Sequence, residues 1–81
     1  MDAEFKRLRW RCRRGTRELD QLLGWWLETR YAGASNELRE GFAALLEQQD
    51  PQLWDWLLGK GAANEPKQAA VIDEIRTRHS V

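Results

Sequence analysis

The chain has 81 residues, 42% of them hydrophobic, which is enough for the core of one small domain and too many for a disordered tail. Thirteen Lys and Arg balance thirteen Asp and Glu, and a net charge of zero argues against a dedicated nucleic-acid binder. Cys12 is the only cysteine, so no internal disulfide or cysteine-based metal cluster is possible, which suits a reducing compartment. No apolar run approaches the ~20 residues of a membrane span, so we expect a single cytoplasmic domain over residues 1–81.

The charges are unevenly distributed along the chain. Residues 1–18 hold seven basic and three acidic side chains (+4), residues 19–65 hold three and eight (−5), and residues 66–81 hold three and two (+1). A basic end on an otherwise acidic chain favours an acidic partner or nucleic acid.

Two helices are predicted in the first part of the chain. The first covers about residues 2–13, and its thin apolar stripe holds Phe5, Leu8 and Cys12. The second covers about residues 16–31, with Thr16 as N-cap, and its broad stripe holds Leu19, Leu22, Leu23, Trp26 and Leu27. Gly15 lies where one periodicity stops and the next starts, so we expect it to turn the chain there with a positive φ.

Three shorter helices are predicted after this. The third has Ser35 as N-cap, ends near Gln48 and buries Leu38, Phe42, Leu45 and Leu46. The fourth has Asp50 as N-cap and Pro51 as its first residue, ends at Gly59 or Gly61, and carries Leu53, Trp54, Leu57 and Leu58. The last begins at Glu65 and Pro66 and turns inward Val71, Ile72 and Ile75. The predicted fold is therefore all-α, a compact single-domain bundle of five short helices.

Few residues are candidates for catalysis. His79 lies near the C-terminus, and we interpret it as a cation at the negative end of the last helix. Arginines around Cys12 would lower the pKa of its thiol, but Cys12 also falls on the apolar stripe, so we interpret it as a buried structural cysteine rather than a nucleophile. The sequence has no Ser/His/Asp set, phosphate-binding glycine loop or metal-ligand spacing, so we expect no enzyme and no metal site.

The five tryptophans fall into two groups. Trp26 and Trp54 are in phase with their leucine stripes and are predicted to lie in the core. The other three, Trp10, Trp25 and Trp56, lie off those stripes. We expect them to pack beneath neighbouring helices, with an exposed aromatic patch for a partner as the alternative.

The arginine-rich stretch from Trp10 to Asp20 contains the predicted bend and would present its side chains rigidly to a partner. Residues 14–18 fit an Arg-Gly-x-x-Glu motif, which follows a Trp-x-Cys-Arg element at residues 10–13 and precedes an Asp-Pro-x-Leu-x-x-Trp-Leu element at residues 50–57. In this order the three elements resemble the succinate dehydrogenase assembly factors, also called flavinylation factors, over about residues 6–78. Thr16 departs from the family pattern, in which methionine is frequent at this position.

The resemblance implies a five-helix domain that binds the flavoprotein subunit of succinate dehydrogenase, and often of fumarate reductase, and promotes covalent attachment of FAD to a histidine of that subunit. It implies that partner contacts come from Arg14, Gly15 and Glu18, with neighbours on the same surface at Arg7, Trp10 and Asp20. The client then carries FAD, and this chain holds no cofactor stably. We expect a monomer that neither inserts into membranes nor binds nucleic acid, although exposed aromatic residues would also allow a dimer.

On this interpretation Arg14 pairs with a carboxylate or a carbonyl of the client, while Glu18 either orients Arg14 or contacts the client itself. Any side chain at position 15 would clash or move the turn. Two other classes of function stay open. Some members of the family are described as antitoxins of toxin–antitoxin pairs, and the basic first helix would also suit a small nucleic-acid-binding protein.

Overall fold

The computed structural model describes residues 3–61, 63 and 65–79, with only the backbone of His79. In these ranges it contains no strand and has five α-helices and one 3-10 turn: α1 (Ala3–Arg11), α2 (Arg17–Thr29), η1 (Tyr31–Gly33), α3 (Asn36–Leu45), α4 (Asp50–Leu57) and α5 (Pro66–His79). The prediction of an all-α bundle of five helices is confirmed. The expected helix start at Asp2 and the expected role of the His79 side chain lie outside the described residues.

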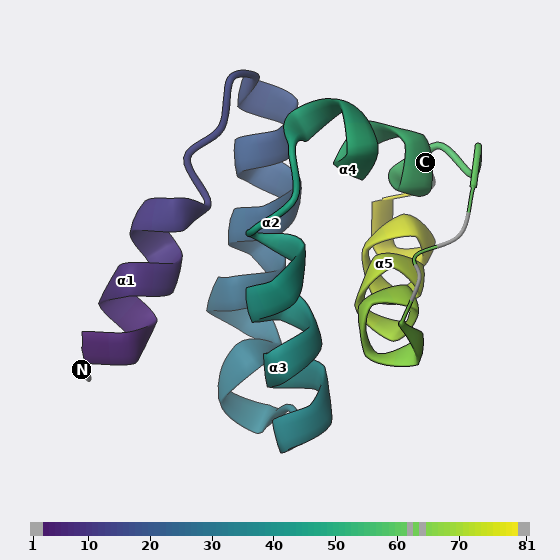
Figure 1. Cartoon of the computed structure of the whole chain (residues 1–81). Coiled ribbons are helices and arrows are strands. Elements are labelled where there is room, and N and C mark those ends of the chain that lie inside the picture. Colours follow the sequence, from purple (N-terminus) through teal and green to yellow (C-terminus); the bar gives the residue numbers. More distant parts are fainter. Residues whose placement is uncertain (1–2, 62, 64, 80–81) are drawn as a thin grey trace.

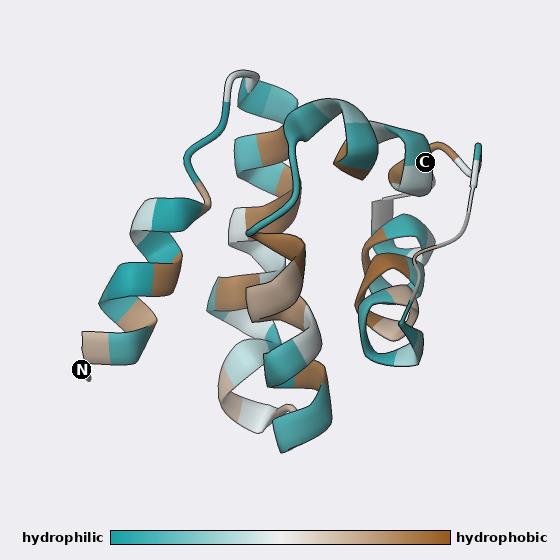
Figure 2. Ribbon diagram, viewed as in Figure 1, coloured by the Kyte–Doolittle hydropathy of each residue, from teal (hydrophilic) through white to brown (hydrophobic). Residues whose placement is uncertain are grey.

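The helices pack around a shared interior. In Figure 1, α1 lies beside α2 at one edge of the molecule and α5 lies at the opposite edge, where it contacts α3, α4 and α2. Figure 2 shows that hydrophobic residues gather on the faces between helices, whereas α1 is mostly hydrophilic. The thin apolar stripe predicted for the first helix is therefore confirmed, since only Leu8 of α1 is fully buried.

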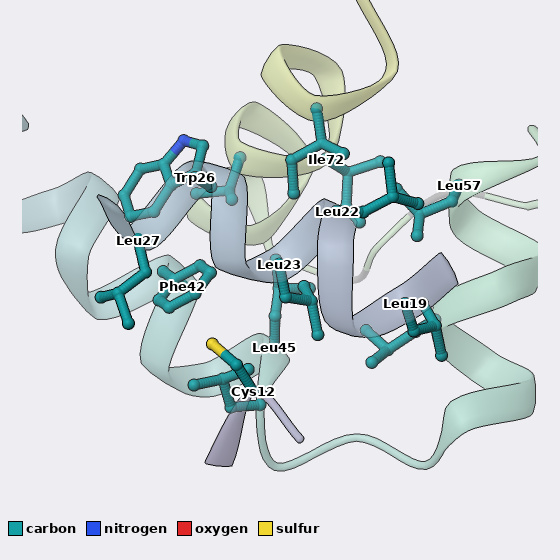
Figure 3. Close-up of a cluster of buried hydrophobic side chains, with 14 of the residues drawn as sticks. Cys12, Leu19, Leu22, Leu23, Trp26, Leu27, Phe42, Leu45, Leu57 and Ile72 are labelled. Carbon is teal, nitrogen blue, oxygen red and sulfur yellow. The ribbon is translucent and has the colours of Figure 1, made fainter. Parts of the chain in front are cut away.

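Every α-helix contributes to the buried core, part of which Figure 3 shows. The buried hydrophobic side chains are Leu8, Cys12, Leu19, Leu22, Leu23, Trp26, Leu27, Phe42, Leu45, Leu46, Leu53, Trp56, Leu57, Val71, Ile72 and Ile75. All five predicted inward residues of the second helix and all three of the last helix are among them. Of the four predicted for the third helix, only Leu38 is half-buried instead of buried.

The predicted face of α4 is partly wrong. Trp56, placed off the stripe, is buried, whereas Trp54 is half-buried and Leu58 is 49% exposed. The reason is that α4 has only eight residues and ends at Leu57, so its inward face is the single turn formed by Leu53, Trp56 and Leu57. The remaining off-stripe tryptophans differ, since Trp25 is half-buried and Trp10 is 69% exposed.

The helix ends follow the expected capping chemistry with one exception. The side chains of Thr16 and Ser35 cap α2 and α3, as predicted. Each accepts a hydrogen bond from the backbone amide of the third residue of its helix. Gly59 ends α4 with φ +80°, and its amide and that of Lys60 donate to carbonyls of the last turn, which is a Schellman motif. Asp50 is not the N-cap of α4, because that residue is Gln49. The carboxylate of Asp50 instead accepts a hydrogen bond from the amide of Gly15.

Trp26 links α2, α3 and α5 at the centre of the core. Its ring stacks on that of Phe42 with centroids 4.6 Å apart, and its indole nitrogen donates to Glu74 Oε1 over 2.8 Å. The guanidinium of Arg30 donates to both oxygens of the same carboxylate. Its hydrogen bonds, together with that of the indole, hold the pKa of Glu74 below its usual range. The polar atom of the buried tryptophan is thereby satisfied.

Gly41 lets α3 and α5 approach closely. A Cβ added at this position would lie 2.4 Å from the carbonyl oxygen of Lys67, in the first turn of α5, so no other residue fits without moving the backbone. Gly24, in the middle of α2, is different, because an added Cβ would meet nothing within 4 Å.

We therefore expect opposite effects from alanine at these two helical glycines. Gly41→Ala should lower the free energy of unfolding by about 1–3 kcal/mol, since overpacking has to displace α5. Gly24→Ala should raise it by about 0.5–1 kcal/mol, since alanine is the better helix former and has room. Urea unfolding of the two variants measures both changes, and a Gly41→Ala chain as stable as the wild type would contradict the close approach of the helices.

Candidate functional site

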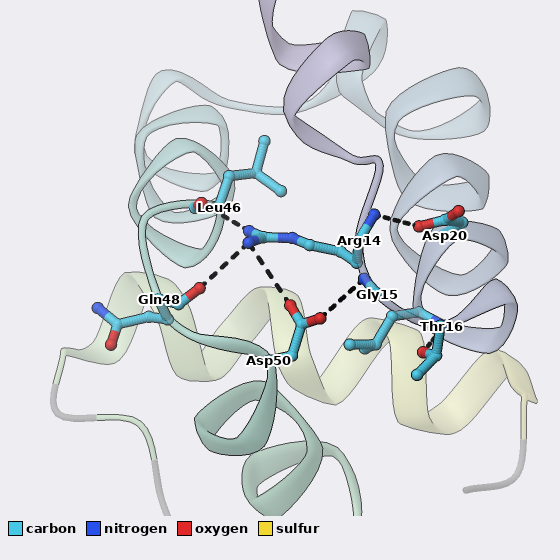
Figure 4. Close-up of polar contacts among 8 residues, drawn as sticks. Arg14, Gly15, Thr16, Asp20, Leu46, Gln48 and Asp50 are labelled. Carbon is cyan, nitrogen blue, oxygen red and sulfur yellow. Dashed lines mark hydrogen bonds and ion pairs between the residues drawn. The ribbon is translucent and has the colours of Figure 1, made fainter.

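The side chain of Arg14 points into the bundle and is only 14% exposed (Figure 4). Its guanidinium donates to the carbonyl oxygen of Leu46 over 2.6 Å and to that of Gln48 over 3.2 Å, and it lies 3.7 Å from the carboxylate of Asp50. The two carbonyls follow the end of α3, where a helix leaves carbonyl groups unpaired and carries partial negative charge. Arg14 therefore closes the C-terminal end of α3, and its observed partners belong to its own chain.

Gly15 lies directly against Asp50. Its amide donates to Asp50 Oδ2 over 2.9 Å, and an added Cβ would come within 3.2 Å of the same oxygen. The expected positive φ at Gly15 is wrong, because Gly59 is the glycine with positive φ in the described part of the chain. Glycine is favoured at position 15 because the carboxylate of Asp50 approaches closely. A side chain added there would crowd this carboxylate.

The bend is held from both sides by carboxylates. Asp20, half-buried in the first turn of α2, accepts a hydrogen bond from the backbone amide of Arg14. Glu18 lies in the same turn but is exposed, and it forms no hydrogen bond or ion pair with the described residues. The structure thus contains no pair between Glu18 and Arg14. Arg14 is oriented by the two carbonyls after α3 together with the carboxylate of Asp50.

Two further predicted residues lie on the outer face of α1. Trp10 is the most exposed large hydrophobic side chain among the described residues, and the guanidinium of Arg13 lies 5.3 Å from its ring centroid. Arg7 is exposed and pairs with Glu4 one turn earlier.

The six predicted site residues therefore separate into two sets. Four are exposed to solvent, namely Arg7, Trp10, Gly15 and Glu18, whereas the side chains of Arg14 and Asp20 are part of the internal support. Asp50 belongs to the same support and was not predicted for it. Its position at the start of the Asp-Pro-x-Leu element could have indicated this role. The same local pattern, however, is equally typical of an N-cap.

Cys12 is 5% exposed, which confirms the interpretation as a buried structural cysteine. Burial raises the pKa of its thiol from an ordinary 9.0 to about 11, against the opposing effect of Arg14 and Arg9. The thiol therefore stays protonated near neutral pH. Among the described residues no group of three or more His, Cys, Asp or Glu is arranged for a metal ion, and no helix has the length and apolarity to cross a membrane.

We expect Asp50→Ala to lower the free energy of unfolding by about 1–3 kcal/mol, because it leaves the amide of Gly15 and the largely buried guanidinium of Arg14 without their carboxylate. Asp55→Ala removes an exposed acid from the same helix and should change stability by no more than about 0.5 kcal/mol. Urea unfolding separates the two variants. Equal losses would show that Asp50 has no special role in holding the bend.

The raised pKa of Cys12 predicts an effect of alkaline pH on stability. The folded chain keeps the thiol proton where the unfolded chain has already lost it, so this contribution is complete below about pH 9 and disappears as the pH rises to about 11. The stability difference between the wild type and Cys12→Ala should therefore shrink across this range. Urea unfolding at several pH values measures the difference, and a constant difference would argue against a buried, protonated thiol.

The chain matches the family described as "Flavinator of succinate dehydrogenase" over residues 6–79. Similar proteins include the FAD assembly factor SdhE of Xylella fastidiosa strain 9a5c, which is 45% identical over 74 residues that cover 91% of this chain and 76% of the relative. The FAD assembly factor SdhE of Coxiella burnetii is 39% identical, with 88% and 87% covered. That of Shewanella oneidensis is 38% identical, with 89% and 88% covered. With the Arg-Gly bend inside the matched region, the chain belongs to the family of flavinators of succinate dehydrogenase.

Proposed function

We propose that the protein is an assembly factor that binds the flavoprotein subunit of succinate dehydrogenase and promotes covalent attachment of FAD to that subunit. Its family supports this function, as do the names of its relatives, and neither points to an antitoxin or a nucleic-acid-binding protein. The observation on which the proposal depends is the Arg-Gly bend, which is supported from inside by Arg14 while Glu18 faces solvent without a partner among the described residues.

The docking surface that we propose consists of the four exposed residues Arg7, Trp10, Gly15 and Glu18. Trp10 has the properties of a binding anchor, since it offers a large ring that is already ordered by the neighbouring Arg13. Glu18 offers a carboxylate to a donor on the client. Arg14 and Asp20 act on the client indirectly, because they hold the backbone on which the other groups are mounted.

A physical mechanism follows from a docking surface without a reactive group. FAD is carried by the client and supplies the reactivity for its own covalent attachment. The role of this chain is to bind the client conformation in which the acceptor histidine and the flavin are aligned, and thereby to raise the population of that conformation. A bend that is rigid before binding loses little conformational entropy when it docks. The factor then needs no catalytic residue and no cofactor of its own.

We place this activity in the cytoplasm, with the factor acting as a monomer. The flavoprotein subunit of fumarate reductase is proposed as a second client, because it presents the same problem of aligning a flavin with a histidine.

Glu18→Ala should reduce the rate of flavinylation about tenfold, the loss expected when a central contact of an interface is removed. Glu37→Ala is the matched control, because Glu37 is also an exposed acid in the first turn of its helix, α3. Both variants lose a similar interaction with the helix dipole, but only Glu18 lies at the bend. The readout is covalent flavin fluorescence of the denatured flavoprotein subunit, in a strain that lacks the factor and expresses each variant. Equal activity of the two variants would exclude a direct role for Glu18.

Gly15→Arg should abolish binding of the flavoprotein subunit while the helical fold survives. The new side chain has to displace the carboxylate of Asp50, which lies 3.2 Å from an added Cβ, and it also covers the exposed bend. Circular dichroism reports the fold, and a pull-down of the purified flavoprotein subunit reports binding. Full flavinylation by this variant would show that the client does not dock at the bend.

A further inference from the structure

A groove of about 550 Å³ lies between the C-terminal end of α1 and α2, and it extends along α2 from Asp20 to Thr29. The buried side chains of Cys12 and Leu27 and the half-buried Trp25 are part of its lining. Polar side chains line it as well, among them Arg13 and Glu28. The groove therefore combines apolar surface with charged and polar side chains that can orient a bound segment.

Gly24 lines this groove and has no structural reason to be glycine. It lies in the interior of α2, where glycine is a poor helix former, and its φ is not positive. An added Cβ would meet nothing within 4 Å, so no close packing requires glycine either, in contrast to Gly41. What glycine does provide at this position is open space, since a larger side chain would occupy part of the groove.

Two of the four charged side chains along the groove form no ion pair with a described residue, the cation Arg13 and the anion Asp20. Arg9 pairs with Glu28 across the two helices, and the carboxylate of Asp20 accepts the amide of Arg14. Arg13 forms no ion pair with a described residue, and its guanidinium lies over the ring of Trp10. The depression beside Trp10, which Arg13 also lines, holds Lys6 and Arg9 and no acidic residue among the described residues of its lining, so an acidic group of a partner is favoured near Arg13.

The groove is also continuous with the docking surface. Arg9 and Arg13 line both the groove and a shallow depression of about 300 Å³ beside Trp10. A single segment of a partner can therefore contact Trp10 and enter the groove.

We propose that the groove binds an acidic segment of the client flavoprotein, with an apolar side chain seated over Gly24 against Trp25 and a carboxylate paired with Arg13. This inference rests on the proposed function, because it assigns a second contact region to the same client. It also gives Gly24 a role in recognition that is independent of the bend.

The test uses the full chain and the purified flavoprotein subunit of succinate dehydrogenase as the probe. Gly24→Leu fills the groove with a good helix former, and Gly33→Leu is its control, because Gly33 also has open space but lies outside the groove in η1. Arg13→Glu reverses the charge at position 13, and Lys60→Glu reverses the charge of an exposed residue after α4. Titration calorimetry gives the dissociation constant of each variant, and thermal unfolding followed by circular dichroism gives its stability.

We expect Gly24→Leu to weaken binding about tenfold while its melting temperature stays equal to that of the wild type or rises. Arg13→Glu should weaken binding by at least as much, and both controls should bind like the wild type. Wild-type affinity of Gly24→Leu would overturn the groove proposal and leave the proposed function intact. If Gly24→Leu does not fold, Arg13→Glu decides, and wild-type affinity of that variant overturns the proposal. A wild-type chain that does not bind the flavoprotein subunit would overturn the proposed function and the groove together.

Discussion

The guanidinium of Arg14 joins the first two helices to the junction between α3 and α4. It donates to two carbonyls just after the end of α3, those of Leu46 and Gln48. It also lies beside Asp50, whose carboxylate accepts the amide of Gly15. Lysine is a poor substitute, because its single ammonium group lacks the planar fork that reaches several oxygens at once. The bend thus owes its shape to a polar cluster, while the apolar core below it positions the helices that carry the cluster.

This arrangement divides the Arg-Gly-x-x-Glu motif between two tasks. Arg14 and Gly15 determine the path of the backbone, the first through its hydrogen bonds and the second by allowing Asp50 to approach. Glu18 is the member of the motif whose side chain faces solvent, and in the proposed docking surface it meets the client beside the exposed backbone of Gly15. On this proposal the motif marks a binding surface that the side chain of Arg14 supports from inside, because the exposed groups are useful only at a defined position.

The sequence allowed most of the fold to be predicted, and the reasons for success and failure are local. The broad stripe of α2 and the caps at Thr16 and Ser35 involve neighbours within a turn or two, so periodicity and capping rules identify them. The single turn that α4 buries is too short to show a period. The sequence therefore predicts the wrong tryptophan in the core, Trp54 instead of Trp56. The inward direction of Arg14 and the supporting role of Asp50 depend on contacts between residues 32 to 36 apart in the chain, which no local pattern reveals.

That separation along the chain has a consequence for synthesis. Residues 1–29 are synthesised before Asp50 and the end of α3, so the nascent N-terminal part carries the motif without the groups that shape it. Translation has to pass α4 before the bend can adopt its final form. A chain truncated before α4 therefore carries the motif but lacks the Asp50 carboxylate that accepts the amide of Gly15.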